Sequence, residues 1–327
     1  MSDYILGNEK VRKYLDNSIR KNTVSHAYIL SGDKGMGKIK VAKEFAMKLI
    51  CEDGQSGCMK CPSCRQFLAG TYPDFFYIDS GDKDSIGIDK IRERIVADVV
   101  IKPYYGKYKI YIIDDADKMT VVAQNALLKT IEEPPEYVVM LLLVKNIDLL
   151  LETVRSRCTK LLMAPVKAER IKNWLINMGV NEEISTVTAS YSNGAPGIAK
   201  DMALSQNFLD IYNKNVKFLE RISGAGIRDI LDFIEELKKR NNGFKDFIDF
   251  LRLWYRDICF IKLTKDIKNL VFVREESIIL RLSREYTLQK INSIIDLIDE
   301  TQFRLNSNVS GETVMELLFM GLRNRRD

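Results

Sequence analysis

Short apolar runs alternate with amphipathic segments over the first half of the chain. Four runs read as strands because each is short, almost wholly apolar and bounded by polar residues or glycine; they are Ala27–Ser31, Phe75–Ile78, residues 110–113 and Val138–Val144. Helical spacing of apolar residues predicts helices between them, at Lys38–Ile50 and at residues 89–100 and 121–131. Strands this apolar, separated by helices, predict an α/β fold with a parallel sheet buried on both faces.

The second half of the chain has a different pattern. Beyond about residue 165 the strand pattern disappears and helices are predicted at residues 168–178 and at Glu182–Tyr191. The turn at residues 192–197 leads into a further helix. From residue 207 onward the periodicity is helical throughout, with apolar stripes that begin at Ile227, Phe244 and Leu288. Such stripes are most simply the core faces of a helical bundle.

Composition narrows the class of protein. The 327 residues are 46% hydrophobic and include only 7 prolines, which suits large cores and excludes a disordered chain. The net charge of +5 is much smaller than the positive charge that a sequence-specific DNA-binding protein concentrates on its surface. The longest apolar run, Val138–Val144, is much shorter than the roughly 20 residues that cross a bilayer, and the N-terminus lacks a signal-peptide profile. We therefore expect a soluble cytoplasmic protein without membrane contact.

A phosphate-binding loop is predicted between the first strand and the helix after it. Gly32, Gly35, Gly37 and Lys38 fit the pattern G-x-x-x-x-G-K in the strand–loop–helix context that the motif requires. The glycines let backbone amides curl around phosphate oxygens, and the helix N-terminus adds positive potential. Lys38 would reach the terminal phosphates. The alternative is a glycine-rich turn without a ligand, which the context disfavours.

Two details make this nucleotide site degenerate. The motif calls for Ser or Thr after the lysine to ligate Mg²⁺, but the chain has Ile39, which offers no oxygen. Asp114 ends an apolar strand as a Walker B aspartate does, placed to reach Mg²⁺. Asp115 stands where many ATPases carry the longer glutamate. Acidic residues solvated at a strand end remain the alternative. We expect an inherited fold rather than working chemistry, and ATP binding is left open.

Four of the six cysteines lie close together, and they suggest a metal site. Cys51, Cys58, Cys61 and Cys64 have the spacing C-x6-C-x2-C-x2-C, and in a reducing cytosol such clustering indicates metal before disulfides. Four thiolates suit tetrahedral Zn²⁺ and leave no open position, so the predicted site is structural. The alternatives are coincidental cysteines, a redox pair or an iron–sulfur cluster, although the spacing does not match the bacterial ferredoxin run.

Taken together, these elements resemble the clamp-loader branch of the AAA+ ATPases. The resemblance runs over most of the chain. The segments that carry it are residues 5–9, 25–28, 125–135 and 154–158, together with a zinc module inserted after the phosphate-loop helix. The segment 154–158 contains Ser156-Arg157-Cys158, which is similar to the Ser-Arg-Cys motif of the family. The resemblance implies an AAA+ P-loop domain at residues 1–164 with its zinc module at 51–64, a helical lid at 165–206 and a helical collar for oligomerisation at 207–327.

The departures from the family pattern imply a subunit without ATPase activity of its own. Ile39 replaces the hydroxyl residue, and Gly197 replaces the expected arginine of the sensor 2 region. In the sensor 1 region, Asn146 fits but the pair before it is not hydroxyl-rich. The resemblance also implies that Arg157 acts in trans, as an arginine finger at the ATP site of a neighbouring subunit.

The partners implied by the resemblance are the gamma/tau and delta types of clamp-loader subunit, the sliding clamp, and primer–template DNA through the assembly. Two other functions are alternatives. The first is an active ATPase subunit of the same loader, against which position 39 and the sensor 2 position argue. The second is an unrelated zinc-containing nucleic-acid-binding protein, which the modest charge disfavours.

Overall fold

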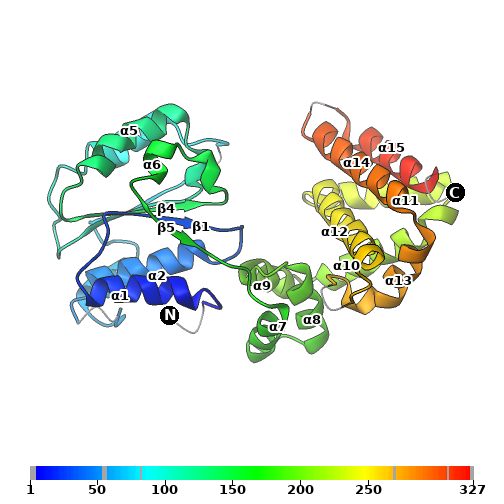
Figure 1. Ribbon diagram of the computed structural model, residues 1–327, viewed down its shortest axis with the longest axis horizontal. Coiled ribbons are helices and arrows are strands. Elements are labelled where there is room, and N and C mark those ends of the chain that lie inside the picture. The colour runs from blue at the N-terminus through cyan, green and yellow to red at the C-terminus, as the bar shows by residue number, and fades with distance from the viewer. Residues whose placement is uncertain (1–4, 54–56, 82, 268–269, 308, 325–327) are drawn as a thin grey trace. The chain divides into compact units, whose positions relative to one another are not determined.

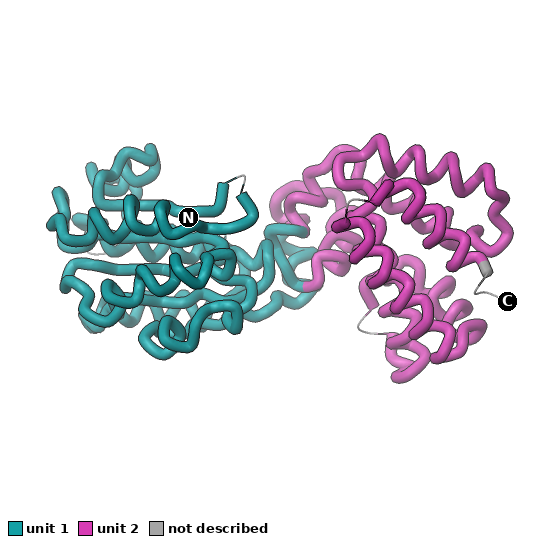
Figure 2. Tube along the Cα trace, turned by 90° about the horizontal axis from the view of Figure 1, so that it is seen from above, with its two compact units in different colours: residues 1–174, 194–198 teal, residues 175–193, 199–327 magenta. Residues whose placement is uncertain are grey.

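The protein forms two compact units in a computed structural model that describes residues 5–53, 57–81, 83–267, 270–307 and 309–324. The first unit comprises residues 1–174 and 194–198, and the second comprises residues 175–193 and 199–327 (Figure 2). The boundaries of a separate lid and collar therefore stay a prediction.

A parallel sheet organises the first unit. Within the described residues it has five strands in the order β2-β3-β4-β1-β5, with every strand pair parallel. The strands are β1 (Ala27–Ser31), β2 (Phe75–Ile78), β3 (Lys109–Ile113), β4 (Val138–Val144) and β5 (Thr159–Leu162). The α/β prediction is confirmed, and β1, β2 and β4 have the predicted bounds. The central strands β1, β3 and β4 are buried along their whole length, as their continuous apolar sequences require.

Helices cover both faces of this sheet (Figure 1). The helices of this unit are α1 (Glu9–Arg20), α2 (Lys38–Ile50), α3 (Pro62–Leu68), α4 (Ile88–Ile91), α5 (Val121–Glu132) and α6 (Glu152–Arg155). Ile110 and Ile112 of β3 share a core with the α2 residue Phe45, whereas Tyr111 and Ile113 belong to the core on the α5 face. This alternation follows from the two-residue period of a strand.

Two elements differ from the sequence prediction. The helix expected over residues 89–100 is α4 followed by a π-helical turn, Arg92–Val96, and then by non-helical turns. Its apolar stripe is still buried. Apolar residues spaced four apart drift slowly around an α-helix, because one α turn takes only about 3.6 residues. A π turn contains more residues, so it keeps the apolar residues on the face that contacts the core. Strand β5 was not predicted, because this short edge strand buries only Leu161 fully and exposes Leu162.

The second unit is helical. Its helices, with α7 and α9 shared with the first unit, are α7 (Ala168–Asn177), α8 (Glu182–Tyr191), α9 (Pro196–Leu204), α10 (Phe208–Arg221), α11 (Ile227–Lys238), α12 (Gly243–Thr264), α13 (Glu276–Glu285), α14 (Leu288–Leu305) and α15 (Gly311–Asn324). The long helix α12 packs against α11, α13 and α14, and its buried Trp254 contacts the rings of Phe250 and Phe272. The three predicted stripes lie on α11, α12 and α14. Among the described residues, no helix is long and apolar enough to cross a membrane.

Candidate functional site

The predicted phosphate loop connects β1 to the N-terminus of α2. Gly35 and Gly37 have φ angles of +80° and +88°, which glycine adopts at little cost. Lys38 begins α2, and Asp114 lies near enough for its charge to act on the Lys38 ammonium. The structure therefore brings the predicted nucleotide-site residues into one place, at the carboxyl ends of β1 and β3.

Lys38 is bound within its own loop. Its Nζ donates to the backbone carbonyl of Gly32 at 2.5 Å and to that of Asp33 at 3.1 Å. Burial lowers the pKa of the Lys38 ammonium, while the negative charge of Asp114 opposes that shift. Two of the three donors of the Lys38 ammonium are thus directed at carbonyl oxygens of its own loop.

The N-terminus of α9 lies directly against the phosphate loop. The Gly197 amide donates to the Gly35 carbonyl oxygen at 2.8 Å. A β-carbon on Gly197 would lie 2.8 Å from that same oxygen, and one on Gly35 would lie 2.5 Å from Ile198 Cγ1. Any side chain at position 197, including the arginine of the sensor 2 pattern, would force these two segments apart.

Replacing Gly197 with alanine is therefore expected to destabilise the first unit. The added methyl group overpacks the contact with Gly35, at a cost of about 1–3 kcal/mol. Calorimetry should show a lower melting temperature than for the wild type. Gly224→Ala is the matched control because a β-carbon there meets only open space; equal melting temperatures for the two variants would contradict the prediction.

The Walker B aspartate is also engaged by protein groups. Asp114 Oδ1 accepts a hydrogen bond from the Asp115 amide at 3.0 Å, and Oδ2 accepts one from the Tyr77 hydroxyl at 2.8 Å. Asp115 pairs with Lys118 at 2.7 Å. Ile39 packs against the apolar core on the α2 face of the sheet. Both carboxylate oxygens of Asp114 thus accept a hydrogen bond from the protein, and the side chain at position 39 has no oxygen.

The sensor 1 region is held by an aspartate that sequence reasoning missed. The Asp117 carboxylate accepts from the amides of Lys145 and Asn146 at 3.3 and 3.4 Å. The Asn146 side chain accepts from the Asp148 amide at 2.9 Å, so it caps the short turn that follows β4. Asp117 lies in the 3-10 helix Ala116–Lys118 that follows β3, and no local pattern in the sequence points to its contact with residues after β4.

The four cysteines form one compact cluster. The sulfur atoms of Cys51, Cys58, Cys61 and Cys64 all lie within 4.8 Å of one another, which is close enough for one metal ion. The amides of Cys58 and Cys64 donate to the sulfurs of Cys51 and Cys61 at 3.4 Å. Cys61 is also the N-cap of α3, and Pro62 supplies the first helical residue. Residues 54–56 of the predicted module lie outside the described residues.

The donor set of this cluster fits a cation that binds thiolates. Burial alone would raise the pKa of Cys51, but hydrogen bonds from the Cys58 and Asp53 backbone lower it to about 6. Burial and the neighbouring sulfurs instead raise the pKa of Cys64. Four thiolates at this spacing repel one another, so a cation is needed to hold all four ionised.

Arg157 lies at the surface, just beyond α6. Its Nη2 pairs with Glu132 Oε1 at 3.0 Å, and its Nη1 donates to the Thr153 carbonyl at 3.0 Å. The side chain is 41% exposed. The next residue, Cys158, is buried, and burial raises the pKa of its thiol to about 12, which leaves it unreactive. The motif thus anchors a sulfur in the core and presents a guanidinium to solvent.

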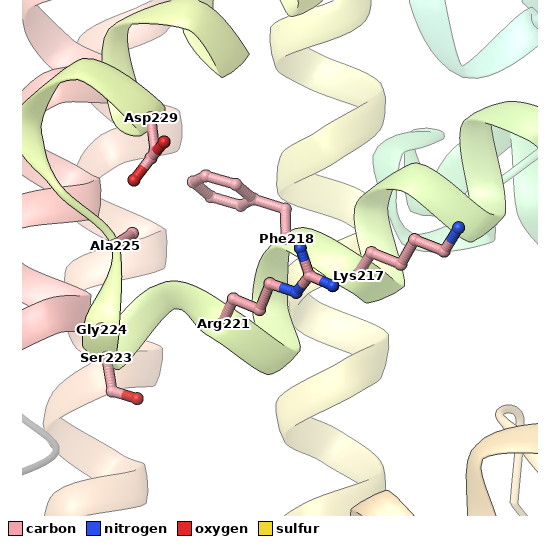
Figure 3. A pocket seen from close by; sticks show the side chains of 7 residues that line it. All are labelled: Lys217, Phe218, Arg221, Ser223, Gly224, Ala225 and Asp229. Carbon is pink, nitrogen blue, oxygen red and sulfur yellow. The ribbon is translucent and has the colours of Figure 1, made fainter.

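A separate open cavity of about 580 Å³ lies in the second unit (Figure 3). It is lined by Lys217, Phe218, Arg221, Ser223, Gly224, Ala225 and Asp229. None of the predicted site residues lies there, so this cavity belongs to neither the nucleotide site nor the cysteine cluster.

The fold and these three sites define an AAA+-type P-loop protein with a four-cysteine insert. A sequence family described as DNA polymerase III, delta subunit, matches residues 7–167. The delta' subunit of Bacillus subtilis DNA polymerase III is 30% identical over 325 residues, which cover 96% of this chain and 95% of that protein. The chain therefore belongs to the AAA+ clamp-loader family of DNA polymerase III subunits. The relative that it matches over almost its whole length is a delta' subunit.

Other relatives of the chain are tau subunits. The Bacillus subtilis tau subunit is 26% identical over 91% of this chain and 57% of its own length. The Escherichia coli tau subunit is 33% identical over 55% of this chain and 28% of its own length. A crystal structure of a gamma subunit-related protein from Thermotoga maritima shares the fold, with a TM-score of 0.50, 18% identity, and coverage of 96% of this chain and 99% of that one.

Proposed function

We propose that the chain is a non-catalytic, delta'-type subunit of the bacterial clamp loader, which loads the sliding clamp onto primed DNA during replication in the cytoplasm. The observation that carries this proposal is Ile39, whose partly buried alkyl side chain packs against the core at the position where a magnesium-binding hydroxyl belongs. The partners would be gamma/tau and delta subunits, the clamp and, through the assembly, primer–template DNA.

Arg157 is the residue that we expect to act in catalysis, at the ATP site of a neighbouring subunit. Its exposure and its position beyond α6 support a role outside its own chain. A guanidinium there would neutralise the charge that develops on the transferred phosphoryl group. Lysine would substitute poorly because the planar fork binds phosphate oxygens bidentately.

The cysteine cluster is proposed to hold one structural Zn²⁺ ion through Cys51, Cys58, Cys61 and Cys64. When bound, the ion would cross-link the module. All four of its coordination positions would be taken by thiolates, so none would be open for chemistry. Glu52 supports the ligand loop, because its Oε1 accepts from both the amide and the hydroxyl of Ser63, at 3.2 and 2.5 Å.

The isolated chain is expected to hydrolyse ATP no faster than its Lys38→Ala variant. The reason is that Lys38 is held by loop carbonyls and that position 39 has no oxygen for Mg²⁺. Phosphate release measured on both proteins checks this expectation. Hydrolysis that disappears in the Lys38 variant would instead favour the second candidate function, an active gamma/tau-type ATPase subunit, which the retained glycines and the tau relatives support.

Assembly provides an independent test of the clamp-loader assignment. Mixed with gamma/tau and delta subunits, the chain should co-elute as one complex, and the complex should hydrolyse ATP when primed DNA is added. Failure to co-elute, combined with salt-dependent binding of DNA by the lone chain, would favour the third possibility, a zinc-containing nucleic-acid-binding protein.

A further inference from the structure

Tyr77 lies beside the Walker B aspartate because of strand register. Tyr77 of β2 is the neighbour of Ile112 of β3 in the parallel pair. Residues two apart along a strand share a face, so Asp114 follows Ile112 on the side of the sheet that α2 covers. Tyr77 and Asp114 therefore meet on the face where α2 carries Lys38 and Ile39.

The contacts of Tyr77 hold its hydroxyl on the Asp114 carboxylate. The hydroxyl donates to Oδ2 at 2.8 Å. The Lys43 ammonium lies 5.3 Å from the centre of the Tyr77 ring, within the range of a cation–π contact. Lys43 follows Ile39 by four residues and thus lies on the same side of α2. The ring is held between α2 and β3, although Tyr77 is 40% exposed.

The Tyr77 hydroxyl lies in the space around Asp114 Oδ2 that the ligand shell of a magnesium ion would need. Mg²⁺ requires a near-octahedral shell of oxygens at about 2.0–2.1 Å. Asp114 Oδ1 accepts from the Asp115 amide and Oδ2 from the Tyr77 hydroxyl, so a magnesium ion that approaches either oxygen finds one of its two lone pairs occupied and, at Oδ2, the phenol beside it. The residues present therefore do not fit the magnesium ion that the fold family implies. The misfit has two separate causes, the Tyr77 hydroxyl on the Asp114 carboxylate and the alkyl side chain of Ile39.

We propose that Tyr77 is a second block to metal binding at Asp114, independent of Ile39. This inference rests on the proposed function, since it explains why the site is degenerate. It implies that a hydroxyl at position 39 alone does not restore a magnesium–nucleotide site, because Asp114 still accepts from Tyr77.

The test compares four proteins: the wild type, Ile39→Thr, Tyr77→Phe, and the double variant. For each, the affinity for a fluorescent ATP analogue is measured with Mg²⁺ and with a chelator. The double variant should bind about tenfold more tightly with Mg²⁺ than without it, since a hydrogen bond to a charged group is of that strength. The wild type and both single variants should show no such gain. Tyr14→Phe combined with Ile39→Thr is the matched control, because Tyr14 is an exposed tyrosine on α1.

Each outcome separates the two ideas. An equal gain in Ile39→Thr alone, or no gain in a double variant that melts like the wild type, overturns the role of Tyr77 and leaves the proposed function standing. A metal-dependent gain in the wild type overturns both. If the double variant melts early, Ile39→Ser with Tyr77→Phe repeats the measurement with a smaller residue at position 39.

Discussion

Replacing Arg157 with alanine is expected to lower ATP turnover by about 10³-fold or more at the neighbouring ATP site of a reconstituted clamp loader, the range known for arginine fingers. The loss is expected because alanine removes a planar, permanently charged donor to the transferred phosphoryl group. DNA-stimulated hydrolysis in a single turnover is the appropriate measurement, because it reports that site before the others complete further cycles.

Engaging a phosphate would require Arg157 to leave Glu132. Both side chains of this pair are about half exposed, at 41% and 44%, and exposed ion pairs contribute at most about 1 kcal/mol. Release therefore costs little compared with the expected gain. Arg157→Lys should recover only a small part of the rate, since an ammonium is a point charge.

A matched control for Arg157 lies in the same unit. Arg170 is 51% exposed and also pairs with a glutamate, Glu9. Arg170→Ala should leave ATP hydrolysis of the complex at the wild-type rate. Co-elution of each variant with the other subunits must be checked first. An intact complex with Arg157→Ala and undiminished hydrolysis would rule out the arginine finger.

Replacing Cys61 with serine is expected to reduce the zinc content from about one ion per chain to nearly none and to destabilise the first unit by roughly 3–5 kcal/mol. Serine is itself a good N-cap, so the start of α3 is preserved and the loss reports the metal. Cys51 and Cys64 are buried in the same core as Phe67, so opening the cluster also loosens the packing beneath it.

Metal analysis and calorimetry on the same samples check this prediction. Cys259→Ser is the control, because Cys259 lies in the second unit and outside the cluster. It should keep the zinc, and its loss of stability should be much smaller than that of Cys61→Ser, because Cys259 is only partly buried against the core of the second unit. Iron in place of zinc would favour an iron–sulfur cluster. A metal-free wild-type protein of undiminished stability would contradict a structural metal.

The strongly apolar strands and the loop motif were predictable from sequence for a physical reason. The β4 sequence is apolar at every position, so only a strand buried on both faces suits it. The glycines and Lys38 form a local pattern whose loop geometry follows from their spacing. The cysteines likewise lie within fourteen consecutive residues, so their proximity in space was nearly dictated by the chain.

The parts that sequence reasoning missed depend on pairing between distant segments. Tyr77 meets Asp114 only through the register of β2 on β3, which no local pattern encodes. The contact between Gly35 and Gly197 joins residues far apart in sequence. The sequence shows that position 197 lacks the expected arginine. Only the structure shows that a side chain there would collide with the Gly35 carbonyl. The role of Arg157, the zinc ion and the domain boundaries stay predictions.

The contact between α9 and the phosphate loop has a thermodynamic consequence. A ligand shifts a conformational equilibrium only by its difference in affinity for the two states. The hydrogen bond from Gly197 to Gly35 is made by the backbone of the chain itself, and in the proposed function no magnesium ion links ATP to the loop beside it. We therefore expect the fraction of molecules that have the contact between Gly197 and Gly35 to be the same at every concentration of ATP. The conformation of this subunit would then stay fixed while neighbouring subunits respond to nucleotide.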